Sequence, residues 1–483
     1  CIHIHFAADL GFTTRNPICL WTEADRVVNA IFVNVSCWQY CCNRSFGPCF
    51  SLCTGVSICV SLCVGFINII PTVAANFSID GAFTIIQLGT DFNERCSICT
   101  CIGTGENVSG RHVGYGDGIY KSLDGGATWN NMGLEASEHI GMIRVDPRDS
   151  DVVYVAAQGP LWSGGGDRGL YKSTDGGKNW RKVLGDGHGN NESDDRYTGV
   201  SEVRMDPRNP DVMYAVTWQR FRNVAVLLNG GPATGIHKSE DGGETWRELT
   251  EGLPEEIMAK TGLAISPQNP DVIYATIELA NRTGSMYRSE DGGESWVKGA
   301  DYAPGGTGPH YYNELWASPH QFDRVYHADV RLPVTEDGGT TFRSINKPNK
   351  HVDNHAIAFD PNDPNYLLVG CDGGLYESWD LGKHWKFVAN LPLTQFYKVA
   401  VDYDEPFYNL YGGTQDNNTQ GGPSRTLSRQ GIRTEDWFVT LGGDGFDVAG
   451  LWEAQPDLDQ VFFTTHAYLG ADNMEKGIRI KTS

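Results

Sequence analysis

From residue 102 onward, short runs of β-branched and aromatic residues alternate with turns rich in Gly, Asp and Pro. One such unit predicts four strands, at residues 140–146, 152–158, 169–173 and 180–184. Alternation at every second residue suits half-buried strands, and the stretches with helical spacing are short. The pattern therefore predicts an all-β protein.

The turn between the third and fourth strands of this unit carries a motif that recurs along the chain. In the copy from Ser173 to Trp180, a hydroxyl residue is followed by Asp, a Gly pair and an aromatic residue. The carboxylate can accept N–H bonds from the turn, the glycines permit positive φ, and the Trp is expected to fill the gap between neighbouring sheets. We interpret these aspartates as structural; they are Asp124, Asp175, Asp241, Asp291, Asp337 and Asp380, with a degraded copy at Asp80.

The spacing of the motif predicts the architecture. Successive aspartates from Asp124 to Asp380 lie 43 to 66 residues apart, and a four-stranded propeller blade needs roughly 40 to 50. The longest interval, from Asp175 to Asp241, implies an insertion. Because the rhythm persists after Trp385, at least eight blades begin. We predict a β-propeller of seven to ten four-stranded blades, with residues 477–483 as the third strand of an incomplete last blade.

These motifs resemble those of the Asp-box, or bacterial neuraminidase repeat, superfamily of β-propellers. The resemblance covers about residues 102–483 and extends to the sortilin-like propellers and to bacterial proteins labelled glycosyl hydrolases. It is also carried by segments such as Gly103-Thr-Gly-Glu106 and Gly370-Cys-Asp-Gly-Gly374. The resemblance implies the fold but not one function, because one fold hosts many functions.

The first hundred residues differ in composition. Twelve of the 13 cysteines lie in residues 1–101, and no charged residue lies between Arg44 and Asp80. A disulfide-rich secreted module, a membrane span at residues 50–70 and a stretch of wrongly assigned residues would each produce this composition. The register of Asp80 favours strands over a membrane helix. We predict an atypical Cys-rich segment at residues 1–45 and the propeller at residues 46–483.

The net charge of −22 excludes a nucleic-acid backbone as the expected partner, because that contact needs clustered Lys and Arg. Cationic or neutral partners stay open, and a solvated acidic surface explains the same charge. No cofactor is expected. Calcium stays open, because acidic loop residues are its preferred ligands.

Polar residues gather where the inner strands meet the channel of the predicted propeller, which is where ligands usually bind. A glycosidase needs two carboxylates across such a channel. The candidates for this catalytic pair are Asp353, Asp372, Asp416 and Asp444. The candidates for ligand binding are Trp162, Trp218, Arg220, His310, Tyr312, His351, His355 and Gln415.

His351, Asp353 and His355 alternate and would lie on one face of a strand, where they would either bind a metal or line the channel. We favour the channel lining, because no fourth ligand is visible.

We therefore expect a secreted, periplasmic or cell-surface propeller that binds a protein, peptide or glycan at its channel mouth or rim, as the sortilin resemblance implies. Two alternatives stay open. The first is a glycoside hydrolase that acts on a polysaccharide through paired carboxylates. The second is an accessory subunit of a larger envelope complex, associated with a membrane through a partner.

Overall fold

The computed structural model describes the chain in segments. They are residues 50–54, 58–62, 74–79, 82–89, 99–110, 113–185, 196–301, 313–389, 394–402, 404–414, 416–443, 445–451, 461–466 and 479–482. The chain divides into two units, Cys1–Pro71 and Thr72–Ser483. In the first unit, β1 (Phe50–Thr54) and β2 (Ile58–Leu62) form an antiparallel hairpin. Among the described residues, no helix is long and apolar enough to span a membrane.

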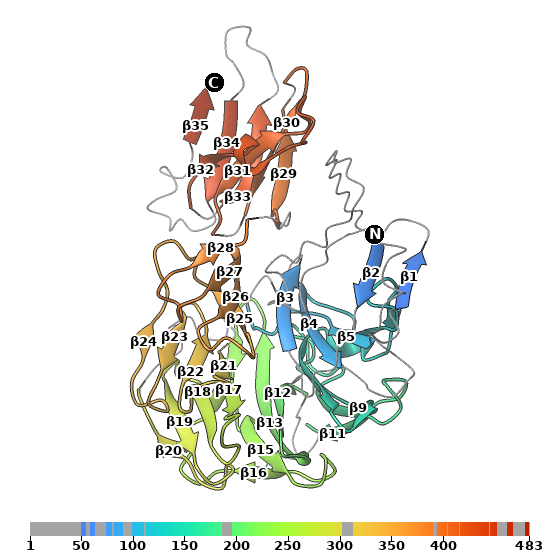
Figure 1. Ribbon diagram of the computed structural model, residues 1–483. Helices are drawn as coiled ribbons and strands as arrows, with labels where there is room; N and C mark the ends of the chain where they lie inside the picture. The colour runs from blue at the N-terminus through green and yellow to red at the C-terminus, as the bar shows by residue number, and fades with distance from the viewer. Residues whose placement is uncertain are drawn as a thin grey trace. The chain divides into compact units, whose positions relative to one another are not determined.

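The second unit is built from antiparallel sheets whose strands follow one another in chain order (Figure 1). The first sheet has five strands: β3 (Ala74–Ile79), β4 (Ala82–Gly89), β5 (Cys99–Gly103), β6 (Ile119–Ser122) and β7 (Asn130–Asn131). The second has β8 (Ile140–Asp146), β9 (Asp149–Ala157), β10 (Gly169–Ser173) and β11 (Arg181–Leu184). The third has β12 (Thr198–Asp206), β13 (Asn209–Arg222), β15 (Gly235–Ser239) and β16 (Arg247–Leu249), with β14 (Leu227–Asn229) paired to β13.

The next sheets repeat this arrangement. They are β17 (Met258–Ile265), β18 (Ile273–Leu279), β19 (Gly284–Ser289) and β20 (Val297–Lys298); then β21 (Glu314–Ala317), β22 (Val325–Ala328), β23 (Pro333–Thr335) and β24 (Arg343–Ser344). They continue with β25 (Asn354–Phe359), β26 (Leu367–Cys371), β27 (Gly374–Ser378) and β28 (Lys386–Phe387); then β29 (Lys398–Val401), β30 (Asn409–Gly413), β31 (Thr419–Pro423) and β32 (Phe438–Leu441). A three-stranded sheet follows, with β33 (Gly445–Leu451), β34 (Val461–His466) and β35 (Arg479–Thr482).

These strands confirm the predicted all-β propeller fold. The described part of the chain contains seven sheets of four or five strands and the start of another. The helices in this part are short 3-10 turns such as Glu135–Ser137 and Thr434–Asp436. The unit chosen from sequence corresponds to β8–β11, with β8 and β10 at the predicted bounds. The insertion before Asp241 is partly explained by the long strand β13 and its hairpin with β14.

The Asp-box turn is held by its own side chains. In the third sheet, the Ser239 hydroxyl donates to Asp241 Oδ1 over 2.7 Å, and the amide of Thr245 donates to the same oxygen over 2.9 Å. The amide of Gly243, at φ 80°, donates to Ser239 Oγ. The same pattern recurs at the other five described copies, those of Asp124, Asp175, Asp291, Asp337 and Asp380. Together these hydrogen bonds outweigh the opposing effect of burial and hold the pKa of each box aspartate at about 2.

Two of the boxes also bind their sheets to the preceding ones through a tyrosine. Tyr154 Oη on β9 donates to the carbonyl of Gly242 over 2.7 Å, and Tyr214 Oη on β13 donates to the carbonyl of Gly292 over 2.8 Å. Both tyrosines are buried. Tyr154 and Tyr214 therefore each bind the box of the next sheet, a role that the sequence pattern alone does not reveal, whereas Tyr274 of the same strand pattern donates to Asp323 Oδ1.

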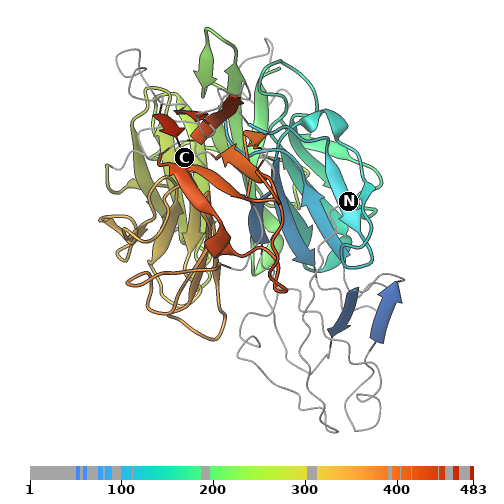
Figure 2. The same cartoon turned by 90° about the horizontal axis from the view of Figure 1, so that it is seen from above.

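The core lies between neighbouring sheets. One cluster joins Tyr214 and Val216 of β13 to Ile273 and Ile277 of β18 and to Trp296 beyond the next box. Figure 2 shows these green and yellow-green sheets from above. The predicted gap-filling role holds for Trp180, whose indole N–H donates to the Met132 carbonyl of the preceding sheet, and for the buried Trp385, which donates to the Ile345 carbonyl. The sheets are thus packed face to face through apolar side chains, which provides the main stabilisation.

Candidate functional site

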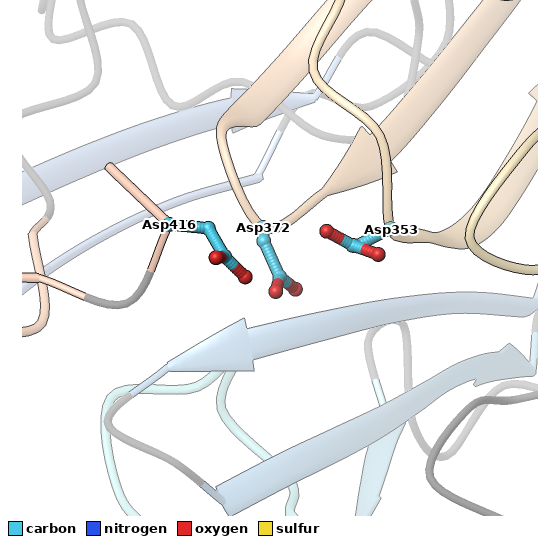
Figure 3. A group of neighbouring side chains, drawn as sticks. All are labelled: Asp353, Asp372 and Asp416. Carbon is cyan, nitrogen blue, oxygen red and sulfur yellow. The ribbon is translucent and has the colours of Figure 1, made fainter. Parts of the chain in front are cut away.

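Three of the predicted aspartates converge. Asp353 immediately precedes β25, Asp372 lies in the turn after β26, and Asp416 lies in the turn after β30. One carboxylate oxygen from each lies within 4.8 Å of the others. Figure 3 shows Asp372 between Asp416 and Asp353. Asp353 is buried, whereas Asp372 and Asp416 are exposed. We call these three residues the acidic site.

Backbone conformation positions two of these aspartates. Asp353 has φ 58° and Asp416 has φ 52°, in the left-handed region that Asp tolerates better than most residues. The positive φ of Asp353 also corrects one prediction. β25 begins at Asn354, so His351 and Asp353 precede the strand, and only His355 lies in it. The three residues therefore do not alternate along one strand face.

His355 supports the acidic site from inside β25. Its Nε2 makes a short hydrogen bond to the Asp372 carboxylate, and its side chain is largely buried. The Asp372 amide donates to the Asp353 carbonyl over 3.2 Å. These contacts fix the turn that carries Asp372 against the segment that carries Asp353.

Glu106 is a fourth acidic group near these residues, and the sequence pattern did not predict it as a site residue. It lies beyond β5, and the first strand of its sheet, β3, lies next to β25. Burial raises the pKa of Glu106 to about 8; the amide of Gly114 opposes this rise, and the charge of Asp372 adds to it. Sequence position held a signal for Glu106, because Glu106, Asp372 and Asp416 each closely follow the strand that precedes the last two strands of its sheet, namely β5, β26 or β30.

Two residues that the sequence predicted to bind a ligand, Arg220 and Trp218, are buried, and the loop after β5 contacts Arg220. Arg220 and Trp218 are 0% and 1% exposed. Arg220 donates from one guanidinium nitrogen to the Val108 carbonyl over 2.5 Å and from the other to the Gly159 carbonyl over 3.1 Å. Trp218 Nε1 donates to Asn229 Oδ1. Neither side chain offers a surface to a sugar or a peptide in this structure.

Asn107 is the centre of this buried network. Its side-chain amide donates to Glu314 Oε1 over 2.8 Å, and its backbone carbonyl accepts a short hydrogen bond from Lys260 Nζ. Burial raises the pKa of Glu314 to about 7 and lowers the pKa of Lys260 to about 8. The chain itself supplies the partners that these groups need when buried.

The remaining predicted residues are dispersed. Trp162 is 47% exposed and lies beyond the end of β9. His351 lies beside Cys371 rather than in the acidic site, and a hydrogen bond between their side chains raises the pKa of His351 to about 9. Asp444, Gln415, His310 and Tyr312 fall outside the described residues, as does Asp80 of the degraded box.

Residues 284–440 match the family model described as sortilin, neurotensin receptor 3 (Sortilin-Vps10). The match covers about a third of the chain. The matched segment begins at β19 and reaches β32. It contains Asp353, Asp372 and Asp416, whereas Glu106 lies before it.

Other similarities are more distant. An oligoxyloglucan-reducing end-specific xyloglucanase of Emericella nidulans is 25% identical over 266 residues, which cover 48% of this chain and 32% of that enzyme. The chain thus matches about a third of the length of that enzyme. A solved GH74 xyloglucanase from Xanthomonas campestris is 13% identical with a TM-score of 0.34, and the match covers 83% of this chain and 84% of that one.

YCF48 from Cyanidioschyzon merolae is 14% identical with a TM-score of 0.40, over 71% of this chain and 94% of that one. A structure of YCF48 bound to D1 peptide is 15% identical with a TM-score of 0.40, over 72% and 96% of the two chains.

Proposed function

We propose that this chain is a secreted, periplasmic or cell-surface propeller that binds a protein or peptide, and that the acidic site receives a cationic group of that ligand. The observation that carries the proposal is the convergence of Asp353, Asp372 and Asp416, whose carboxylate oxygens lie within 4.8 Å of one another. Two of the three are exposed, so a ligand can reach them from solvent.

Electrostatics favours a cationic ligand over a neutral one. Carboxylates at this separation repel each other, and an approaching cation relieves that repulsion. An Arg side chain suits the site best, because its planar guanidinium donates to two carboxylate oxygens at once. The net charge of −22 would also speed the approach of a basic ligand. The name of the matched family includes a neurotensin receptor, which is consistent with a peptide ligand.

The test uses the full chain and two fluorescein-labelled peptides of equal length, one with alternating Gly and Arg and one with alternating Gly and Glu. Fluorescence anisotropy should show saturable binding of the Arg peptide alone. Asp372→Asn and Asp416→Asn should each weaken binding about tenfold or more, because each removes a charge-assisted hydrogen bond. Glu255→Gln is the matched control, because it removes an exposed carboxylate distant in sequence from the acidic site. Equal affinity in all four proteins would refute the proposal.

Calcium is the competing occupant of the acidic site. Calcium takes six to eight oxygen ligands, and the three carboxylates of the acidic site supply only part of that set. Calorimetric titration of the full chain with CaCl2 distinguishes the two. Tight calcium binding that Asp372→Asn abolishes, without any peptide binding, would replace the peptide proposal with a metal site.

Glycoside hydrolysis is a second candidate, and Glu106 is the observation that favours it. A carboxyl group with a pKa of about 8 is protonated at neutral pH and can act as a general acid, with Asp372 close enough for its charge to act on Glu106. A reducing-sugar assay with xyloglucan oligosaccharides tests this. Hydrolysis that is lost in Glu106→Gln and in Asp372→Asn would support catalysis, whereas absence of product from wild type across a panel of β-glucans would remove this candidate.

A further inference from the structure

The loop after β5 inserts three consecutive residues among the other sheets. Asn107, Val108 and Ser109 are 3%, 5% and 0% exposed, and we call residues 107–109 the inserted segment. The side chains that hydrogen-bond to it come from the four sheets that follow in the chain; they are Gln158 beyond β9, Arg220 and Arg222 on β13, Lys260 on β17 and Glu314 on β21. One short segment thus lies where side chains of four further sheets converge.

Three basic side chains bind the main chain of the inserted segment. Lys260 donates a short hydrogen bond to its first carbonyl, Arg220 donates to its second carbonyl over 2.5 Å, and Arg222 donates to its third carbonyl over 2.7 Å. All three basic side chains are buried. Every residue of a peptide carries a backbone carbonyl, so this row of donors suits a peptide main chain of any sequence.

The side chain of Asn107 is bound from two sides. Its Nδ2 donates to Glu314 Oε1 over 2.8 Å, and its Oδ1 accepts a short hydrogen bond from Gln158 Nε2. A carboxamide offers both a donor and an acceptor, whereas an ionised carboxylate offers only acceptors and an aliphatic group offers neither. These two contacts therefore select a carboxamide side chain at the first position of the inserted segment.

Polar contacts, rather than the apolar cores, hold the inserted segment. Its apolar side chain, Val108, packs with Val113 in a small cluster apart from the larger cores between the sheets. In the part of the chain that the structure describes, three buried atoms at this site have no hydrogen-bond partner, namely Ser109 Oγ, Gln158 Oε1 and Arg220 Nε. Leaving such atoms without partners is costly. A peptide that makes the same contacts and also satisfies these atoms can therefore exchange with the inserted segment.

We propose that the side chains around the inserted segment form a second binding site, for a peptide that carries an Asn side chain, and that the inserted segment occupies this site as an internal competitor. The incoming peptide displaces the inserted segment. Its backbone carbonyls accept hydrogen bonds from Lys260, Arg220 and Arg222, and its Asn side chain takes the place of Asn107. The proposal does not depend on the acidic site, because a neutral peptide offers that site no cation.

The test uses the full chain with Asn107→Ala, which weakens the internal competitor, and the fluorescein-labelled peptide Gly-Gly-Asn-Val-Ser-Gly. Fluorescence anisotropy should show saturable binding, about tenfold or more tighter than to wild type, because the two side-chain contacts of Asn107 no longer compete. The same peptide with Asp in place of Asn should bind about tenfold or more weakly, because a carboxylate cannot donate to Glu314.

Further changes in the Asn107→Ala chain locate the peptide. Gln158→Ala should weaken binding about tenfold, because it removes the donor to the Asn side chain. Gln430→Ala is the matched control, because it removes an exposed Gln, and it should leave binding unchanged. Asp372→Asn should also leave binding unchanged, which separates this site from the acidic site.

A second measurement keeps the contacts of Asn107 intact. Ser109→Cys replaces a buried hydroxyl that has no hydrogen-bond partner among the described residues with a thiol of similar size. N-ethylmaleimide should label the introduced thiol about tenfold or more faster when the Asn peptide is present, because displacement of the inserted segment exposes it. Digestion and peptide mass spectrometry measure this rate, and the Asp peptide should leave it unchanged.

Several results would overturn the proposal. One is equal affinity of the Asn and Asp peptides for Asn107→Ala, and another is equal affinity of the Asn peptide for wild type and Asn107→Ala. A third is absence of binding to Asn107→Ala when circular dichroism shows that this variant is folded. A loss of binding in Asp372→Asn would assign the peptide to the acidic site instead. An unchanged labelling rate in Ser109→Cys would overturn the proposal by itself, whether or not Asn107→Ala folds.

Discussion

Individual carboxyl groups of this chain occupy two opposite environments. The Asp-box aspartates accept several hydrogen bonds at exposed turns, which keep their pKa values at about 2. Glu106, by contrast, is largely removed from water, and burial raises its pKa to about 8. The same side-chain chemistry therefore stabilises turns in one place and leaves a protonated carboxyl group near the acidic site in another.

Glu106 permits a prediction at this scale. Its pKa rises on folding from 4.5 to about 8, so the folded state prefers the protonated form. The stabilisation is complete below pH 4.5 and is lost as pH rises toward 8. Glu106→Gln keeps a neutral side chain at every pH and should reduce the fall in melting temperature between pH 5 and pH 8.5. Calorimetry at both pH values checks this, and an unchanged fall would contradict the assigned environment of Glu106.

At the scale of the element, the hairpin of the box and the second strand of the preceding sheet act together. The box fixes its own turn with side-chain oxygens, and the buried carbonyl of Gly292 in that turn accepts a hydrogen bond from the Tyr214 hydroxyl of the neighbouring sheet. The same pairing occurs at Tyr154 and Gly242. In these two places a local turn therefore helps to set how one sheet packs on the next.

Tyr214→Phe tests this contact. The change removes the hydroxyl that donates to the Gly292 carbonyl inside the protein and leaves that carbonyl without this partner. Urea denaturation should show a loss of about 1 to 2 kcal/mol in the free energy of unfolding. Tyr120→Phe is the matched control, because its hydroxyl bonds Asp117 at an exposed position within one sheet. An equal loss of unfolding free energy in the two variants would show that the contact between sheets stabilises the fold no more than an exposed hydrogen bond does.

At the scale of the whole molecule, charge is the dominant feature. The chain carries a formal net charge of −22. Burial nevertheless raises the pKa of three acidic groups, to about 7 for Glu278 and Glu314 and to about 6 for Asp329. These groups are therefore partly protonated near neutral pH. Glu278 lies on β18, Glu314 begins β21 and Asp329 follows β22, and all three side chains are buried. Raising the pH charges them where water does not solvate them.

The pH dependence of stability should therefore pass through a maximum near pH 4 to 5. Above it, Glu278, Glu314 and Asp329 lose their protons and destabilise the folded state as pH rises toward 8. Below it, the box aspartates lose stability as pH falls from 3.8 toward 2. Melting temperatures from pH 2.5 to pH 9 measure this. A maximum at or above pH 7 would show that the buried acids do not control the profile.

The sequence by itself determined the repeating unit, because the box turn is local: Ser239, Asp241 and Gly243 lie within five residues, and their hydrogen bonds need no distant partner. Periodicity likewise located β8 and β10. Only the tertiary structure decided which polar residues meet. It joined Asp353 to Asp416, bound Asn107 to Glu314 and filled the space beside Arg220 with the loop after β5. Such contacts depend on how separate sheets pack, and packing acts between segments that sequence spacing cannot relate.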